Sequence, residues 1–203
     1  MQMRARCLGV VLSSLVGIGI APAAAGDAVP FPGRATASEG RHDFDWEVGR
    51  WKTRLRRLAN PLSHTDAPQW VEYEGTSTVS PVLDGRANLV ELRVQGPAGK
   101  IEGASLRLYN PQTRQWSLNF ASVRGGTLTR PVFGGFRHGR GEFHGLEDLD
   151  GRQVLVRFVI SAITSDSARF EQAYSDDGGA TWETNWIAID TRMPAPPSPP
   201  AGG

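Results

Sequence analysis

The sequence has only one cysteine, Cys7, among its 203 residues. This cysteine lies near the N-terminus, at the start of an uncharged run. The rest of the chain has no thiol, which excludes disulfide bonds, a zinc–thiolate site and a cysteine nucleophile there. A lipoprotein anchor would need a cysteine just after the apolar run, and none follows it. The downstream domain must therefore be stabilised by packing alone.

A long apolar run is also missing. The apolar stretch near the N-terminus, Cys7–Ile20, is too short to cross a bilayer but suits the apolar region of a signal peptide. Arg4 and Arg6 precede it, and Ala23–Ala25 follows it with the small residues that signal peptidase requires. The pattern predicts a signal peptide over residues 1–25, cleavage before Gly26, and a periplasmic or secreted protein without a membrane anchor.

The chain has no excess of either charge. Removing the signal peptide leaves 20 basic and 21 acidic residues from the original 22 and 21, because two arginines are lost. This balance excludes the strongly basic surface that nucleic acid or an anionic membrane would require. Residues 26–41, rich in Pro, Gly, Ala and Ser, are predicted to form a flexible leader, and residues 193–203 a Pro-rich disordered tail. The remaining residues, 42–192, are long enough for one domain with a core of its own.

Helical periodicity and internal repeats are absent from this domain, and the pattern predicts an all-β structure. Short runs rich in Val, Thr, Leu and aromatic residues alternate with turn residues. Only Asp43–Gly49 offers a helical turn. The series predicts an antiparallel up-and-down barrel of about 8–10 strands, because closure removes the exposed sheet edges. The expected strands are Trp51–Leu58, Trp70–Val79, Asn88–Val94, Ala104–Tyr109, Trp116–Val123, Phe133–Arg137, Gly141–Leu146, Gln153–Ala162, Ala168–Tyr174 and Thr181–Asp190.

The segment His42–Trp51 resembles the start of lipocalin-like (calycin) barrels, in which a Gly-x-Trp motif opens the first strand. Here the motif is Gly49, Arg50 and Trp51. The resemblance implies that Trp51 closes the barrel floor and that Arg192, at the end of the last strand, stacks over its ring. Such a cation–π contact would join the first and last strands and contribute about 1 kcal/mol.

The whole domain resembles an uncharacterised family of secreted bacterial proteins with this fold. The hairpin Leu108–Trp116 and the hairpin around Ser175–Trp182 carry the resemblance together with the opening motif. It implies no particular activity, because barrels of this kind serve as carriers, isomerases and haem binders alike.

The segment Ser175–Trp182 also matches the Asp-box of sialidase propellers at every specified position. Asp177 can accept hydrogen bonds from turn amides, Gly179 permits positive φ, and Trp182 can pack beneath the loop. The box occurs once, in a chain too short for a six-bladed propeller. We therefore interpret it as a structural hairpin without sialidase chemistry.

Motifs for catalysis or metal binding are weak or absent. No Gly-x-Ser-x-Gly elbow is present, and no catalytic residue is assigned. His138 and His144 are six residues apart with carboxylates nearby, a spacing that permits a metal site but favours surface or pocket-lining roles. Asp148–Gly151 has the wrong spacing for a calcium loop and is interpreted as a hairpin turn. We predict neither a metal nor a cofactor.

Several strands are partly apolar on both faces, the pattern of a closed barrel whose apolar interior holds a few polar groups and encloses a small ligand. The opposing interpretation is that each polar side chain simply points to water. The polar residues that we predict to face the interior and bind the ligand are Glu91, Arg107, Asn119, His144 and Arg157.

The sequence therefore predicts a binding protein for a small, largely apolar molecule. One alternative is an enzyme of isomerase or hydrolase type that acts on such a molecule by proton transfer, with His144 or Glu91 as acid or base. The other is a protein-interaction module that uses its outer face and has no pocket.

Overall fold

The computed structural model describes residues 40–194. The predicted signal peptide, most of the predicted leader and most of the predicted tail lie outside these residues. Each of the ten predicted strands is present, and Phe133–Arg137 corresponds to β6. The strands are β1 (Gly49–Leu58), β2 (Trp70–Val82), β3 (Ala87–Gly96), β4 (Gly99–Asn110), β5 (Gln115–Ser122), β6 (Val132–Arg137), β7 (Arg140–Leu149), β8 (Arg152–Ser161), β9 (Ser167–Ser175) and β10 (Glu183–Arg192).

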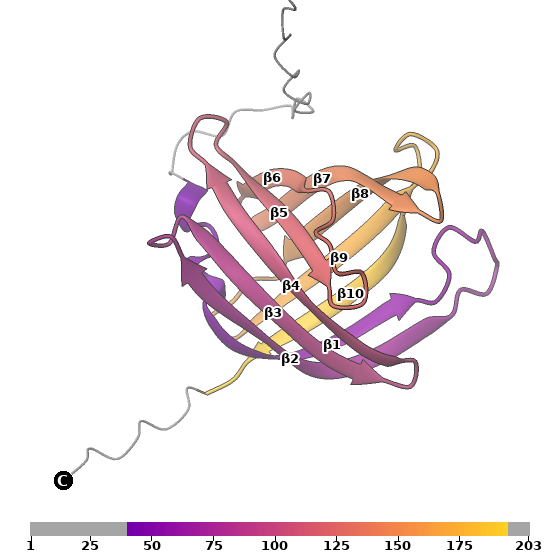
Figure 1. The fold of residues 1–203 in the computed structure, drawn as a ribbon, viewed down its shortest axis with the longest axis horizontal. Coiled ribbons are helices and arrows are strands. Elements are labelled where there is room, and N and C mark those ends of the chain that lie inside the picture. Colours follow the sequence, from indigo (N-terminus) through magenta and orange to yellow (C-terminus); the bar gives the residue numbers. More distant parts are fainter. Residues whose placement is uncertain (1–39, 195–203) are drawn as a thin grey trace, which may run out of the picture. The chain divides into compact units, whose positions relative to one another are not determined.

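The strands form one closed antiparallel barrel in which each pairs with its neighbours in sequence (Figure 1). β1 pairs with β10 to close it, with Trp51 opposite Arg192. The predicted all-β, up-and-down barrel is therefore confirmed. Two short 3₁₀ turns, η1 (Gly40–His42) and η2 (Asp45–Glu47), precede β1 where a single helical turn was expected.

Strand alternation decides which side chains face the interior, because neighbouring side chains point to opposite faces. In β1, Trp51, Thr53 and Leu55 are buried, whereas the residues between them are exposed. Across the closing seam Thr53 pairs with Asp190 and Leu55 with Ala188, so the same parity continues in β10. The interior is thus one continuous set of alternate residues from ten strands.

One end of the barrel is closed by aromatic side chains. Phe44, between the two 3₁₀ turns, packs edge-on against Trp116, with 4.8 Å between ring centroids. The indole N–H of Trp51 donates to the Glu47 carbonyl at 2.6 Å, and that of Trp116 donates to the Gly40 carbonyl at 2.7 Å. These bonds tie the 3₁₀ turns to the barrel end. In Figure 1 the turns, in indigo, lie at the end opposite to the loop that joins β1 and β2.

The wall is weakest between β5 and β6, which pair only over Trp116–Leu118 and Val132–Gly134. The connecting segment, residues 123–131, folds back onto β5 instead of extending the pairing. The Thr129 amide donates to the Phe120 carbonyl at 2.7 Å, and its hydroxyl accepts from the Phe120 amide at 3.1 Å. Segment 123–131 therefore pairs with the part of β5 that β6 does not reach.

Within residues 40–194, no helix combines the length and the apolar character needed to cross a bilayer. In the same part of the chain, no group of three or more His, Cys, Asp or Glu side chains is arranged to hold a metal ion.

Candidate functional site

The interior holds a cavity of about 420 Å³. Its wall is mainly apolar, with contributions from Val90, Leu118, Phe158, Phe170 and Trp186. At one end the aromatic floor closes it. At the other end the lining includes residues of the β1–β2 loop and of segment 123–131, where the cavity reaches the surface. A mainly apolar cavity with one closed end and a few polar groups is typical of sites for small ligands.

A buried ion pair lies at the closed end. The Arg107 guanidinium of β4 donates to both carboxylate oxygens of Glu47 in η2, and its second bond measures 3.3 Å. The Arg107 guanidinium also lies over the Phe44 ring, 4.4 Å from its centroid. Both charged side chains are almost completely buried, at 4% and 2% relative exposure. Each of the two opposite charges therefore has its partner in direct contact beside the aromatic floor.

A cluster of three hydrogen-bonded polar side chains lies next to the ion pair, where β1 pairs with β10. The Thr53 hydroxyl donates to Ser77 at 3.1 Å, and the Ser77 hydroxyl donates to the Asp190 carboxylate at 2.9 Å. Burial raises the pKa of Asp190 to about 6, against the opposing effect of the neighbouring Thr53 and Ser77 hydroxyls. All three residues line the cavity. A carboxyl group that titrates near neutral pH therefore lies at the closed end.

The open end carries a different set of polar groups. Burial raises the pKa of Glu147, and the hydrogen bond from the Tyr174 hydroxyl opposes that rise. The pKa of Tyr174 is raised by its burial and by the neighbouring carboxylate. Arg57 and Arg130 also line this end. A bulge between Thr184 and Trp186 adds Asn185 to the lining, where its side-chain oxygen accepts from Gln172 at 3.2 Å.

Two of the five predicted ligand-binding residues line the cavity. Arg107 lies at the closed end, in the ion pair with Glu47. Asn119 belongs to the outward-facing row of β5, since it pairs with Leu106, but it lies at the weak part of the wall and donates to the Thr129 carbonyl at 3.1 Å. Both therefore border the space that a ligand would occupy, at opposite ends.

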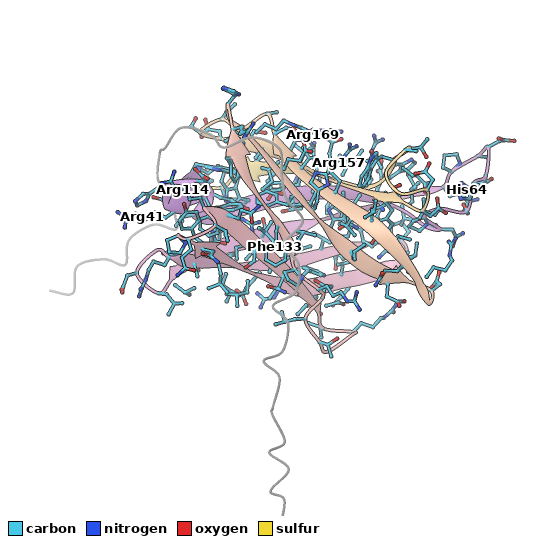
Figure 2. All side chains as sticks on the ribbon, turned by 90° about the horizontal axis from the view of Figure 1, so that it is seen from above. Arg41, His64, Arg114, Phe133, Arg157 and Arg169 are labelled. Carbon is cyan, nitrogen blue, oxygen red and sulfur yellow. The ribbon has the colours of Figure 1, made fainter. Side chains whose placement is uncertain are left out.

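The other three, Glu91, His144 and Arg157, do not line the cavity, which corrects the interior placement expected from the sequence. Glu91 is exposed and pairs with Arg93 at 3.3 Å. His144 and Arg157 are cross-strand partners on the outward parity of β7 and β8. Figure 2 shows Arg157 with Arg169 on the same side of the barrel, and His64 at the tip of the β1–β2 loop. Which face of its strand each side chain occupies decides whether it points inward, and the residue types alone did not reveal that face.

Trp182 explains the positions of His144 and Arg157. The Arg157 guanidinium lies over the Trp182 ring at 4.6 Å from its centroid, and the His144 ring meets it edge-on at 5.9 Å. The His144 imidazole also lies 2.9 Å from a carboxylate oxygen of Glu142. The two side chains thus pack around the Asp-box tryptophan on the outer wall.

The Asp-box itself is a hydrogen-bonded hairpin between β9 and β10. The Asp177 carboxylate accepts from the amide and the hydroxyl of Thr181, at 2.9 and 2.6 Å, and from the Ser175 hydroxyl at 2.7 Å. The Trp182 indole donates to the Gly179 carbonyl at 3.1 Å. Gly179 has φ +92°, which a side chain would strain. The box is on the outside of the barrel and contributes no residue to the cavity lining.

The floor has the geometry that the Gly-x-Trp resemblance implies. The Arg192 guanidinium lies 4.1 Å from the centroid of the Trp51 ring. It also donates to the carbonyl oxygens of Val48, at 3.0 Å, and Ser165, at 2.6 Å, and to that of Trp46. Gly49, with φ +129°, lets the chain turn from η2 into β1 beside this guanidinium.

Sequence reasoning missed the polar groups that the structure places inside, above all Glu47, Thr53, Ser77 and Asp190. A usable signal was present for two of them. Thr53 shares the parity of Trp51 in β1, and Asp190 shares that of Trp186 in β10. Glu47 gave no such signal, because it enters the barrel from a 3₁₀ turn that has no strand parity.

The search of protein-family models found no match for this chain. The search of curated proteins found none either. Solved structures do match. The S-type phycobiliprotein lyase CPES from Guillardia theta has a TM-score of 0.54 and 15% sequence identity, and the match covers 78% of this chain and 97% of that one.

Two further matches are less similar. EF1p2_mFAP2b bound to DFHBI has a TM-score of 0.41 and 10% identity, and the match covers 77% of this chain and 100% of that one. The redesigned β-barrel mFAP0 bound to DFHBI has a TM-score of 0.40 and 11% identity, with 72% and 99% covered. At these identities the similarity concerns the fold alone. The chain has a closed, ten-stranded antiparallel β-barrel fold that is similar to the fold of the phycobiliprotein lyase.

Proposed function

We propose that this protein binds one small, largely apolar molecule inside the barrel. The observation that carries the proposal is the cavity of about 420 Å³, lined mainly by apolar side chains and closed at one end by the Glu47–Arg107 ion pair, which packs on the aromatic floor. Burying apolar ligand surface there provides affinity of about 25 cal/mol per Å² before the costs of association. The few polar groups at the two ends orient the molecule.

We propose also that binding takes place in the periplasm or outside the cell. The support is in the sequence alone: Arg4 and Arg6, the uncharged run Cys7–Ile20 and the small residues Ala23–Ala25. A domain without thiols suits an oxidising compartment, since it forms no unwanted disulfide bonds there.

The experiment compares one substitution on the two faces of the wall. Ser105 faces the cavity, whereas Ser117 belongs to the outward parity of the neighbouring strand. Ser105→Phe should fill the cavity, and Ser117→Phe should leave it unchanged. Native mass spectrometry of the purified proteins detects any molecule that they carry. Calorimetry then measures their affinity for added 1-adamantanol.

Ser105→Phe is expected to lose the carried molecule and to weaken adamantanol binding at least about tenfold, with Ser117→Phe equal to wild type. Equal binding by both variants would place the ligand outside the barrel and refute the proposal. So would a wild-type protein that carries nothing and binds no apolar compound.

Asp190 gives specific support to a second candidate, an acid–base enzyme acting on the bound molecule. A carboxyl group with a pKa near 6 can donate and accept a proton at neutral pH. Glu91 and His144 lie outside the cavity, so the acid or base of such an enzyme would be Asp190. Chromatography and NMR of the ligand after incubation test this candidate: a converted ligand with wild type, and an unchanged one with Asp190→Asn, would favour it over simple carriage.

A further inference from the structure

The closed end of the cavity contains one more carboxyl group than it has cations. Glu47, Arg107 and Asp190 are all buried there, at 2%, 4% and 5% relative exposure. The terminal nitrogens of Arg107 bind the two oxygens of Glu47. Both charges act on Asp190, but within residues 40–194 the Asp190 carboxylate receives one hydrogen bond, from the Ser77 hydroxyl, and has no direct contact with a cation. An ionised Asp190 is therefore a buried charge without a cation of its own, which is costly.

Asp190 also has unused hydrogen-bonding capacity. Its Oδ2 atom accepts from Ser77, whereas its Oδ1 atom is buried and has no hydrogen-bond partner among the described residues. A buried acceptor without a partner costs about 1–3 kcal/mol of stability, so a ligand group that satisfies it gains affinity. Since Asp190 lines the cavity, that group would come from whatever occupies the closed end.

We infer that the bound molecule carries an ammonium group at its inner end, from which the Asp190 carboxylate accepts a hydrogen bond. This inference rests on the proposed binding function and specifies its ligand class. The apolar body of the molecule fills the wall region between Val90, Leu118, Phe158 and Trp186. A carboxylate ligand would add a third acid to the closed end, and a pure hydrocarbon would leave Asp190 unsatisfied.

The charges around the cavity define the pH dependence of this binding. At the closed end they are Glu47, Arg107 and Asp190, and Thr53 and Ser77 are the neutral hydroxyls that complete that end.

The open end has Arg57, Arg130, Glu147 and Tyr174. These are separated from Asp190 by the apolar part of the wall, so Asp190 is the group at the closed end whose ionisation changes near pH 6. An ammonium ligand prefers the ionised carboxylate, and its affinity should rise as pH passes through that value.

The test uses three ligands with one rigid hydrocarbon body: 1-aminoadamantane, 1-adamantanol and 1-adamantanecarboxylate. Calorimetry with the full chain at pH 7.5 should show the amine bound about tenfold or more tightly than the alcohol, and the carboxylate bound most weakly. At pH 5 about a tenth of Asp190 is ionised, so the amine should bind about tenfold more weakly while the alcohol is unchanged.

Asp190→Asn should bring the amine to the affinity of the alcohol at both pH values. Asp84→Asn removes the same charge from an exposed turn and should retain the amine preference. If Asp190→Asn does not fold, the pH dependence of amine binding to the wild-type protein still tests the inference, because it requires no variant.

Equal binding of amine and alcohol by wild type would overturn the inference while leaving cavity binding intact. Persistence of the amine preference in folded Asp190→Asn would overturn it as well. Binding of none of the three ligands would contradict both the inference and the proposed function.

Discussion

The contact between Arg192 and Trp51 should couple the two ends of the domain energetically. The perturbation is a pair of substitutions, Trp51→Ala and Arg192→Met, made singly and together. Trp51 is completely buried, so its removal leaves a cavity at the barrel floor and should cost about 3–5 kcal/mol. Arg192→Met keeps an apolar stem over the ring and removes only the guanidinium.

The structure indicates a larger cost for Arg192 than a cation–π contact alone would give. The guanidinium lies 4.1 Å from the Trp51 ring centroid and also donates to three backbone carbonyls, of Trp46, Val48 and Ser165. These contacts together should contribute about 2–4 kcal/mol to the free energy of unfolding, a range that allows for the exposure of the hydrogen bonds to Val48 and Ser165 to solvent. The shared part, which the double variant measures, should be about 1–2 kcal/mol because the ring is desolvated.

Urea unfolding followed by circular dichroism measures these free energies. Arg56 and Trp70 form a matched control, a cation–π pair on the outer wall at 4.9 Å. Arg56→Met and Trp70→Ala should show a coupling of only about 0.5 kcal/mol, since Arg56 is exposed to solvent. A coupling between Trp51 and Arg192 no larger than that of the control pair would refute the argument that this contact helps to close the barrel.

Three other measurements follow. N-terminal sequencing of protein exported with its own leader should find Gly26 first, and exported protein that retains Met1 would contradict the signal-peptide prediction. Asp177→Ala should lower the melting temperature without changing ligand binding. Hydrogen bonds from Thr181 and Ser175 hold the pKa of Asp177 below its ordinary value of 3.8, so this stabilisation should be present above about pH 4 and lost as pH falls further. For Asp190 the sign is opposite: its raised pKa means that wild-type stability should fall by up to about 3 kcal/mol as pH rises from about 4 to about 6, and Asp190→Asn should lack this component.

Local signals were sufficient for the elements of the fold. Strand runs and turn residues, such as Asp148–Gly151 and the Asp-box, are short-range features, and each predicted strand appears in the structure. The Asp148 side chain accepts from the Gly151 amide at 2.9 Å, as a hairpin turn requires and a calcium loop does not. Closure also could be predicted, because an open sheet of so many strands would expose two edges.

The candidate site was only partly predictable. Arg107 was placed inside correctly, whereas Glu91, His144 and Arg157 were not, since a polar residue in a strand points inward or outward according to its parity with buried neighbours. That parity depends on pairing across the barrel: Asp190 faces the cavity because it lies opposite Thr53, a residue far from it in the sequence.

The sequence by itself thus determined the strand order, the turns and an all-β barrel, because these depend on alternation and on residues a few positions apart. Only the tertiary structure decided what the barrel contains. The 3₁₀ turns bring Glu47 to Arg107, and the closing seam brings Asp190 to Ser77. Both contacts join residues far apart in the chain, and their energy depends on burial that exists only after the barrel has closed.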